Sequence, residues 1–166
     1  MDIRAFQLRA ARSVTGLGVR EIGAYCDVSR TTISSLELLE SHKVLKLERT
    51  KINALLFLFE QYNIFFPDED SVRMKAKQEC DIQYLSRFQF RAGRSILQLS
   101  QTQLGDVVGA SCSQISKIEK NNNQNCVSVA TEVDITLCLK FFEGQGLIFS
   151  EKYTIAFPEK LKKSTS

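Results

Sequence analysis

The sequence predicts a mainly α-helical protein made of two tandem five-helix units, each followed by a short β-hairpin. Three observations support this fold class. A segment of the chain occurs twice, which is typical of a duplicated structural unit. Within each copy, apolar residues recur at helical spacing. The 166 residues include only two prolines and eight glycines, and the long stretches between them favour helices over a turn-rich β fold.

The repeat sets the domain boundaries. Residues 6–37 align with residues 88–119 at an offset of 82 without a gap, and 12 of the 32 positions are identical. Average composition would give about two identities by chance. A looser match places residues 52–60 over 135–143 at an offset of 83. The predicted parts are a first unit with its hairpin at 1–73, a linker at 74–81, a second unit with its hairpin at 82–158 and a flexible tail at 159–166. Because each unit has its own apolar skeleton, we expect the second unit to fold alone.

The elements of the first unit follow from spacing, breaks and capping signals. The predicted helices are a first that starts near Ile3 and ends before Gly16, a second at 19–26, a third after the N-cap Ser29, a weaker fourth near 45–49 and a strong fifth at 51–62. Helical spacing stops at Ile64, and a Pro67–Asp68 turn follows, which predicts a hairpin. In the second unit we expect the same around Glu151–Lys152.

The second and third helices of each unit are short and joined by a tight turn, as a helix-turn-helix requires. In that motif the first helix supports the second, which can then protrude into a major groove. Only small residues fit where the two helices cross, which explains Gly23 and Gly105. At the turn, Gly109 can adopt a left-handed backbone, and Asp27 is the tolerable substitute in the first unit.

Each unit resembles the Cro/phage-repressor (Xre-type) helix-turn-helix family, which has a lambda-repressor-like fold. The second unit has the family's pattern at Leu99, Gln101, Leu104, Val108-Gly109, Ser111, Ile115-Ser116 and Ile118-Glu119-Lys120-Asn121. The first unit keeps the apolar skeleton, but it has Val19 where the family usually has Gln and Asp27 where it usually has Gly. The resemblance covers roughly 6–66 and 88–149, and it implies a DNA-binding transcriptional regulator.

The resemblance also implies which residues meet DNA. It places a phosphate contact at the start of the second helix and base-reading positions at the start and middle of the third. The candidate DNA-binding residues are Arg30, Thr31, Thr32, Ser35, Arg94, Gln101, Thr102, Cys112, Ser113, Gln114, Lys117 and Lys120. Of these, Gln101 takes the phosphate position, and Arg94 and Lys120, with Arg12, are candidates for phosphate neutralisation. An arginine such as Arg30 can bond two guanine acceptors at once.

Several of these residues have a second interpretation that the sequence leaves open. Arg12 and Arg94 fit equally well as partners of Glu37 and Glu119, holding the first helix to the third. Cys112 is either a thymine-methyl contact, an oxidation sensor or a tolerated small residue. We expect His42 to be a solvated loop residue. The phenylalanines are expected in the core, with a dimer face as the alternative: Phe57, Phe59, Phe65, Phe66, Phe141, Phe142 and Phe149.

Composition narrows the function classes further. The net charge is +3, from 22 Lys plus Arg against 19 Asp plus Glu, which is too mild to indicate nucleic acid by itself. No apolar run approaches the roughly 20 residues that span a bilayer, and no signal peptide is evident, so we expect a cytoplasmic protein of a bacterium or phage. Five scattered cysteines and one histidine predict free thiols and no metal site. No catalytic motif is present, so we expect no enzyme activity, no cofactor and no small-molecule ligand.

The expected function is therefore sequence-specific binding of double-stranded DNA, with RNA polymerase as a further candidate partner. The alternative is a protein-interaction module, such as a polymerase-binding co-regulator or an antitoxin-like partner, in which one or both units do not bind DNA. Two assemblies fit the duplication: the two units act together as a dimer would, or the chain forms a homodimer that presents four units.

Overall fold

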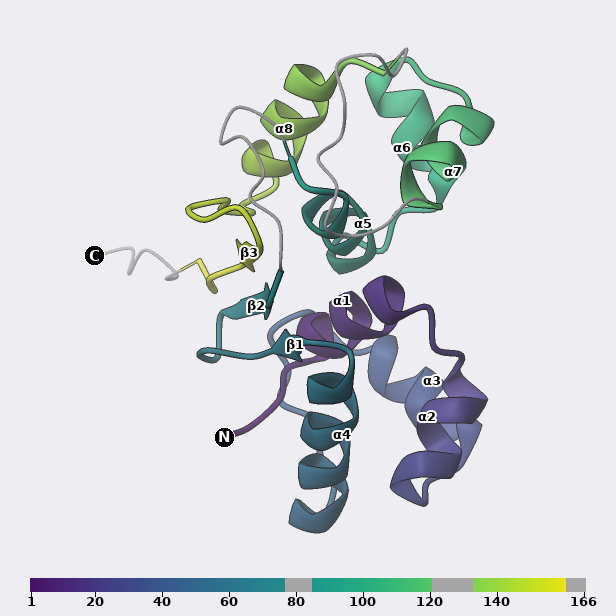
Figure 1. Ribbon diagram of the computed structural model, residues 1–166, viewed down its shortest axis with the longest axis vertical. Coiled ribbons are helices and arrows are strands. Elements are labelled where there is room, and N and C mark those ends of the chain that lie inside the picture. Colours follow the sequence, from purple (N-terminus) through teal and green to yellow (C-terminus); the bar gives the residue numbers. More distant parts are fainter. Residues whose placement is uncertain (77–84, 121–132, 161–166) are drawn as a thin grey trace, which may run out of the picture.

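The protein is mainly helical with one small antiparallel sheet, as the computed structural model in Figure 1 shows for residues 1–76, 85–120 and 133–160. The elements in chain order are α1 (Ala5–Thr15), α2 (Val19–Cys26), α3 (Arg30–Glu37), α4 (Arg49–Gln61), β1 (Ile64–Phe65), β2 (Ser71–Met74), α5 (Arg87–Ile96), α6 (Gln101–Val108), α7 (Cys112–Glu119), α8 (Ile135–Gly144) and β3 (Thr154–Ala156).

Helix ends in the first half follow the local signals in the sequence. Helix α1 stops at Gly16, which adopts a left-handed backbone with φ of 74° and donates its amide to the Arg12 carbonyl. Helix α2 covers the predicted residues 19–26. Ser29 caps α3, because its Oγ accepts the Thr32 amide hydrogen at 3.0 Å. These capping predictions are confirmed.

The crossing of α2 over α3 requires a residue without a Cβ atom at Gly23, and the crossing of α6 over α7 requires the same at Gly105. A Cβ atom at Gly23 would lie 2.6 Å from the Val28 carbonyl oxygen, and one at Gly105 would lie 2.3 Å from the Ala110 oxygen. Both distances are shorter than carbon and oxygen tolerate. The turns that follow have left-handed residues where expected, Asp27 with φ of 53° and Gly109 with φ of 69°.

The prediction of five helices in each unit is wrong in the first half, where the described residues form four. Residues 45–48 belong to no helix or strand, the Leu47 amide donates to the Leu45 carbonyl at 3.2 Å in a tight turn, and Arg49 is the first residue of α4. Val44 forms an isolated bridge to Arg4, and Leu45 is buried while Val44 and Lys46 face solvent. This alternation has a period of two and not the 3.6 of a helix. The equivalent segment of the second half lies outside the described residues.

The two predicted hairpins meet in one sheet of order β1-β2-β3, which the sequence did not predict. The predicted hairpin of β1 and β2 is confirmed. In the second half Ile148 and Ala156 form an isolated antiparallel bridge, the pairing expected of a hairpin around Glu151–Lys152, and β3 also pairs with β2. Met74, expected in the linker, is the last residue of β2. Pairing with β3 covers a strand edge that a free hairpin would expose.

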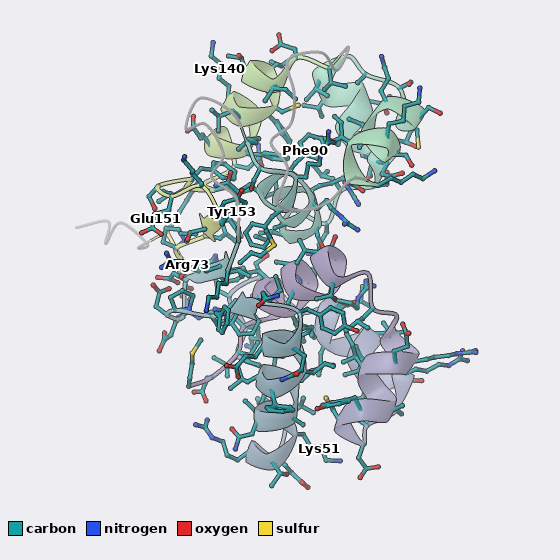
Figure 2. All side chains as sticks on the ribbon, viewed as in Figure 1. Lys51, Arg73, Phe90, Lys140, Glu151 and Tyr153 are labelled. Atoms are coloured by element: carbon teal, nitrogen blue, oxygen red, sulfur yellow. The ribbon has the colours of Figure 1, made fainter. Side chains whose placement is uncertain are left out.

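The halves also share their interior, which argues against the expectation that the second unit folds alone. Helix α1 packs along α5 at the centre of the molecule (Figure 1), and one continuous cluster of buried apolar residues draws on both halves. The Ser95 hydroxyl donates to the Arg9 carbonyl at 3.0 Å. Arg73 on β2 and Glu151, which precedes β3, form an ion pair at 3.3 Å and lie close together in Figure 2.

Two side chains lie differently from the expectations. His42 is not a solvated loop residue: its ring lies 5.6 Å from that of Phe6 and 4.8 Å from that of Phe157, between the two halves. The sequence could not show this contact because Phe157 is 115 residues away along the chain. Of the phenylalanines expected in the core, Phe59, Phe66 and Phe142 are buried, whereas Phe57 on α4 is 55% exposed.

Candidate nucleic-acid interface

The outer face of α7 has a basic stripe. Ser113, Lys117 and Lys120 are exposed and stand four and three residues apart, so they line one side of the helix. Ile115 and Ile118 occupy the opposite side and are buried. Cys112, the first residue of α7, is also exposed, but it lies beside this stripe and not on it. The helix therefore presents hydroxyl and ammonium groups to solvent.

The corresponding stripe of α3 has a different chemistry. Thr31 and Ser35 are exposed at the positions equivalent to Ser113 and Lys117. Leu38, at the end of the helix, takes the place of Lys120 and is 79% exposed. Sequence reasoning missed Leu38, although the alignment of the two copies places it opposite Lys120. The α3 stripe itself is uncharged, and the neighbouring Arg30 supplies the one cation.

Thr32 and Gln114, two of the candidate binding residues, are engaged in helix capping. The Thr32 amide and hydroxyl both contact the Ser29 hydroxyl, at 3.0 and 2.8 Å. The Gln114 side chain accepts the Ser111 backbone amide hydrogen through Oε1 at 2.7 Å, and the Gln114 backbone amide donates to Ser111 Oγ at 3.2 Å. These contacts close a reciprocal capping box and hold the first turn of α7 in place. Thr102, another of the candidate DNA-binding residues, is exposed at the start of α6.

Beneath the α7 stripe, the Glu119 carboxylate accepts hydrogen bonds from three side-chain nitrogens. It is 6% exposed, and Arg94 on α5 binds it through two nitrogens at 2.5 and 2.8 Å. Gln101 at the start of α6 donates to the same carboxylate at 2.7 Å. Arg94 also donates to the Leu99 carbonyl at 2.6 Å. Of the two roles left open for Arg94, the pairing with Glu119 is the one in the structure, and its guanidinium joins α5 to α7 and to the loop before α6.

The Gln101 amide links this network to the N-terminus of α7. Its Nε2 serves Glu119, while its Oε1 accepts a hydrogen bond from the Cys112 thiol at 3.8 Å. The side chain expected at a phosphate is therefore bonded inside the protein. Cys112 contacts a neighbour while its surface stays exposed. Both residues position α7 relative to α6.

The first half has a reduced version of the same network. Arg12 forms an ion pair with Glu37, as Arg94 does with Glu119. Both side chains are more exposed than their counterparts, at 33% and 12% against 17% and 7%. Val19 occupies the position of Gln101 and offers no donor to the carboxylate. We infer that α3 is held less firmly than α7.

Arginines concentrate where the halves meet. A polar cavity of about 290 Å³ lies there, lined by Arg12, Ser13, Gly16, Leu17, Arg91, Arg94, Ser95 and Glu119. Burial lowers the pKa of Arg9, and the nearby Glu37 carboxylate acts in the opposite direction. Arg9 donates to the carbonyl oxygens of Glu37 and Leu39 at 2.8 and 3.0 Å. Through these bonds the Arg9 guanidinium holds the C-terminal end of α3 against α1.

The two pairs of short helices lie on one side of the molecule. In Figure 1, α2 with α3 and α6 with α7 are on the right, α4 and α8 are on the left, and α1 and α5 lie between them. In the part of the chain that the structure describes, no helix is long and apolar enough to cross a membrane. Within the same residues, no cluster of His, Cys, Asp and Glu side chains is suited to a metal ion.

Comparison with protein-family models, with curated proteins and with solved structures finds no match to this chain.

Proposed function

We propose that the protein binds double-stranded DNA sequence-specifically and regulates transcription, with α2–α3 and α6–α7 as two helix-turn-helix motifs of the Xre type. The observation that carries this proposal is the duplicated crossing geometry. Each pair of helices crosses at a glycine whose Cβ would lie within 2.6 Å of a carbonyl oxygen, and each then presents an exposed polar stripe on its second helix. A short, supported and protruding helix is what the major groove accepts.

The chemistry of the stripes suits base edges and phosphates. Arg30 offers two parallel donors for the acceptors of guanine, and the hydroxyls of Thr31 and Ser113 serve either donors or acceptors. Lys117 and Lys120 neutralise phosphates or bond guanine. Arg94 and Gln101 act as positioning residues, since both bind Glu119. Transcription is then controlled by occupying a promoter or by presenting a surface to RNA polymerase.

A protein-interaction module is the second candidate, and it applies to the first half. Leu38 stands 79% exposed in an otherwise uncharged stripe of α3, and Phe57 is 55% exposed on α4. Exposed large apolar side chains of this kind occur at protein interfaces. In this alternative the second half alone binds DNA.

Selection of duplexes from a random pool by the full chain, followed by mobility-shift titration at moderate salt, tests the proposal. The Arg30→Ala and Lys117→Ala variants should each lose about 1–3 kcal/mol of affinity and relax preference at one or two base pairs. Lys140→Ala removes an exposed lysine from α8, on the opposite side in Figures 1 and 2, and serves as the matched control. A chain that retains no duplex, or variants that bind as the parent does, would overturn the proposal.

A further inference from the structure

We infer that a single chain binds one bipartite DNA site with two unlike, inverted half-sites, because the two halves form an internal dimer with approximate twofold symmetry. This inference rests on the proposed DNA binding. It concerns the number of chains on a site, the fixed spacing of the half-sites and the difference between them.

The register of the β2–β3 pair carries the symmetry. At the offset of 83, Ser71, Val72 and Arg73 are equivalent to Thr154, Ile155 and Ala156. In the sheet, Ser71 pairs with Ala156, Val72 with Ile155 and Arg73 with Thr154. The first residue of each three-residue segment therefore pairs with the third residue of the other segment, and the central pair joins two equivalent residues. A twofold axis through Val72 and Ile155 produces this register.

Hydrogen bonds at the ends of the two strands obey the same symmetry. The Met74 amide donates to the Tyr153 carbonyl at 2.9 Å, and the Phe157 amide donates to the Asp70 carbonyl at 2.7 Å. Met74 is equivalent to Phe157, and Asp70 to Tyr153, so each bond is the symmetry mate of the other. Such a reciprocal contact is what defines an isologous dimer interface.

Helices α1 and α5 extend the symmetric interface. They are equivalent elements that pack against each other, and hydrogen bonds from the side chains of Arg9 and Ser95 join them. The Arg9 guanidinium reaches the Ile96 carbonyl at 3.4 Å, and the Ser95 hydroxyl reaches the Arg9 carbonyl at 3.0 Å. Two separate elements thus hold the halves, which prevents free rotation of one half against the other.

The resulting arrangement suits successive turns of one duplex. Contacts run from α3 to α1, from α1 to α5 and from α5 to α7, the order in which Figure 1 shows them. Three helix-packing steps of about 8–10 Å place α3 and α7 at most about 24–30 Å apart. Half-sites one helical turn apart are separated by about 34 Å. Both helices therefore reach the same face of a duplex with a small tilt or bend.

The half-sites differ because the stripes differ. The α7 stripe has Lys117 and Lys120, whereas the α3 stripe has Ser35 and Leu38 at these positions. Lysines favour phosphates and guanine, and binding through them weakens with salt. A hydroxyl with an exposed leucine favours the methyl group of thymine. We expect a G-containing half-site with strong salt dependence under α7 and a T-containing half-site under α3.

The test uses the full chain and a duplex selected from a random pool. Native mass spectrometry should find one chain per duplex, and protection from hydroxyl radicals should show two segments about one helical turn apart. Inserting five base pairs between the segments turns one half-site to the far side of the duplex, and affinity should fall about 100-fold. Inserting the same five base pairs outside the segments is the control and should leave affinity unchanged.

Variants assign each half-site. Leu38→Ala should relax preference in one segment alone, and Lys117→Ala in the other alone. Two chains per duplex with a symmetric motif, or affinity that ignores the insertion, would overturn the internal dimer while leaving DNA binding intact. Binding confined to the α7 half-site would also overturn it and would favour a protein partner for α3. If no duplex is retained at all, the proposed function itself fails.

Discussion

Removing the guanidinium of Arg94 separates a structural role from a role at the DNA backbone. In Arg94→Ala the carboxylate of Glu119, which is 6% exposed, loses two charge-assisted hydrogen bonds at 2.5 and 2.8 Å. Removing one partner of a buried pair costs about 3–5 kcal/mol, and the hydrogen bond from Gln101 remains, so we expect about 3 kcal/mol. For a chain of this size, that lowers the melting temperature by about 6–12 °C.

The assay combines thermal unfolding, followed by circular dichroism, with DNA affinity at several salt concentrations. Because Arg94 serves Glu119, the slope of log K against log salt should be unchanged in Arg94→Ala. Lys117→Ala is the matched control, with a nearly unchanged melting temperature and a slope reduced by about 0.9. Arg12→Ala breaks the more exposed pair with Glu37 and should cost less than Arg94→Ala. A slope reduced by about one, with an unchanged melting temperature in Arg94→Ala, would refute the structural role.

Three further predictions follow from the fold. Gly105→Ala should lower stability by about 2 kcal/mol, since its Cβ would lie 2.3 Å from a carbonyl oxygen, whereas Gly144→Ala has open space and should be neutral or stabilising; equal melting temperatures would contradict the crossing geometry. Burial lowers the pKa of His42 below its ordinary value of 6.5, so the unfolded chain binds the proton more readily and the stability of the fold should fall as the pH drops below about 6.5. Between pH 7 and 5 the melting temperature of His42→Phe should lack this fall, and identical pH profiles of the two proteins would count against the prediction. Residues 85–160 expressed alone should lack the cooperative melting of the full chain, because they lose α1 and β2; a fragment that melts sharply would show two independent cores.

Local features of the fold could be predicted from the sequence because their causes are local. The Ser29 cap, the bounds of α2 and the need for glycine at Gly23 follow from neighbouring residues. The absence of a helix at 45–48 was missed because the alternating apolar residues there are too few to outweigh a helical interpretation. The contact between His42 and Phe157 was missed because it joins distant parts of the chain.

The exposure of the candidate residues on α3 and α7 could be predicted from the sequence, but the bonding partners of Arg94 and Gln101 could not. The duplication placed Lys117 and Thr31 on exposed stripes, because periodicity decides which side of a helix is buried. It could not decide whether Arg94 and Gln101 face solvent or Glu119, since that choice depends on the packing of three helices. Nor could it show that the two hairpins pair with each other, because either strand edge satisfies the sequence pattern.

The most direct test of DNA reading by α3 and α7 is amide hydrogen exchange of the full chain with and without a selected duplex. The account predicts slower exchange in α3 and α7 and in the turns before them, with α4 and α8 unchanged. Protection confined to α4 and α8, or retained DNA with no change in α3 and α7, would contradict the central claim.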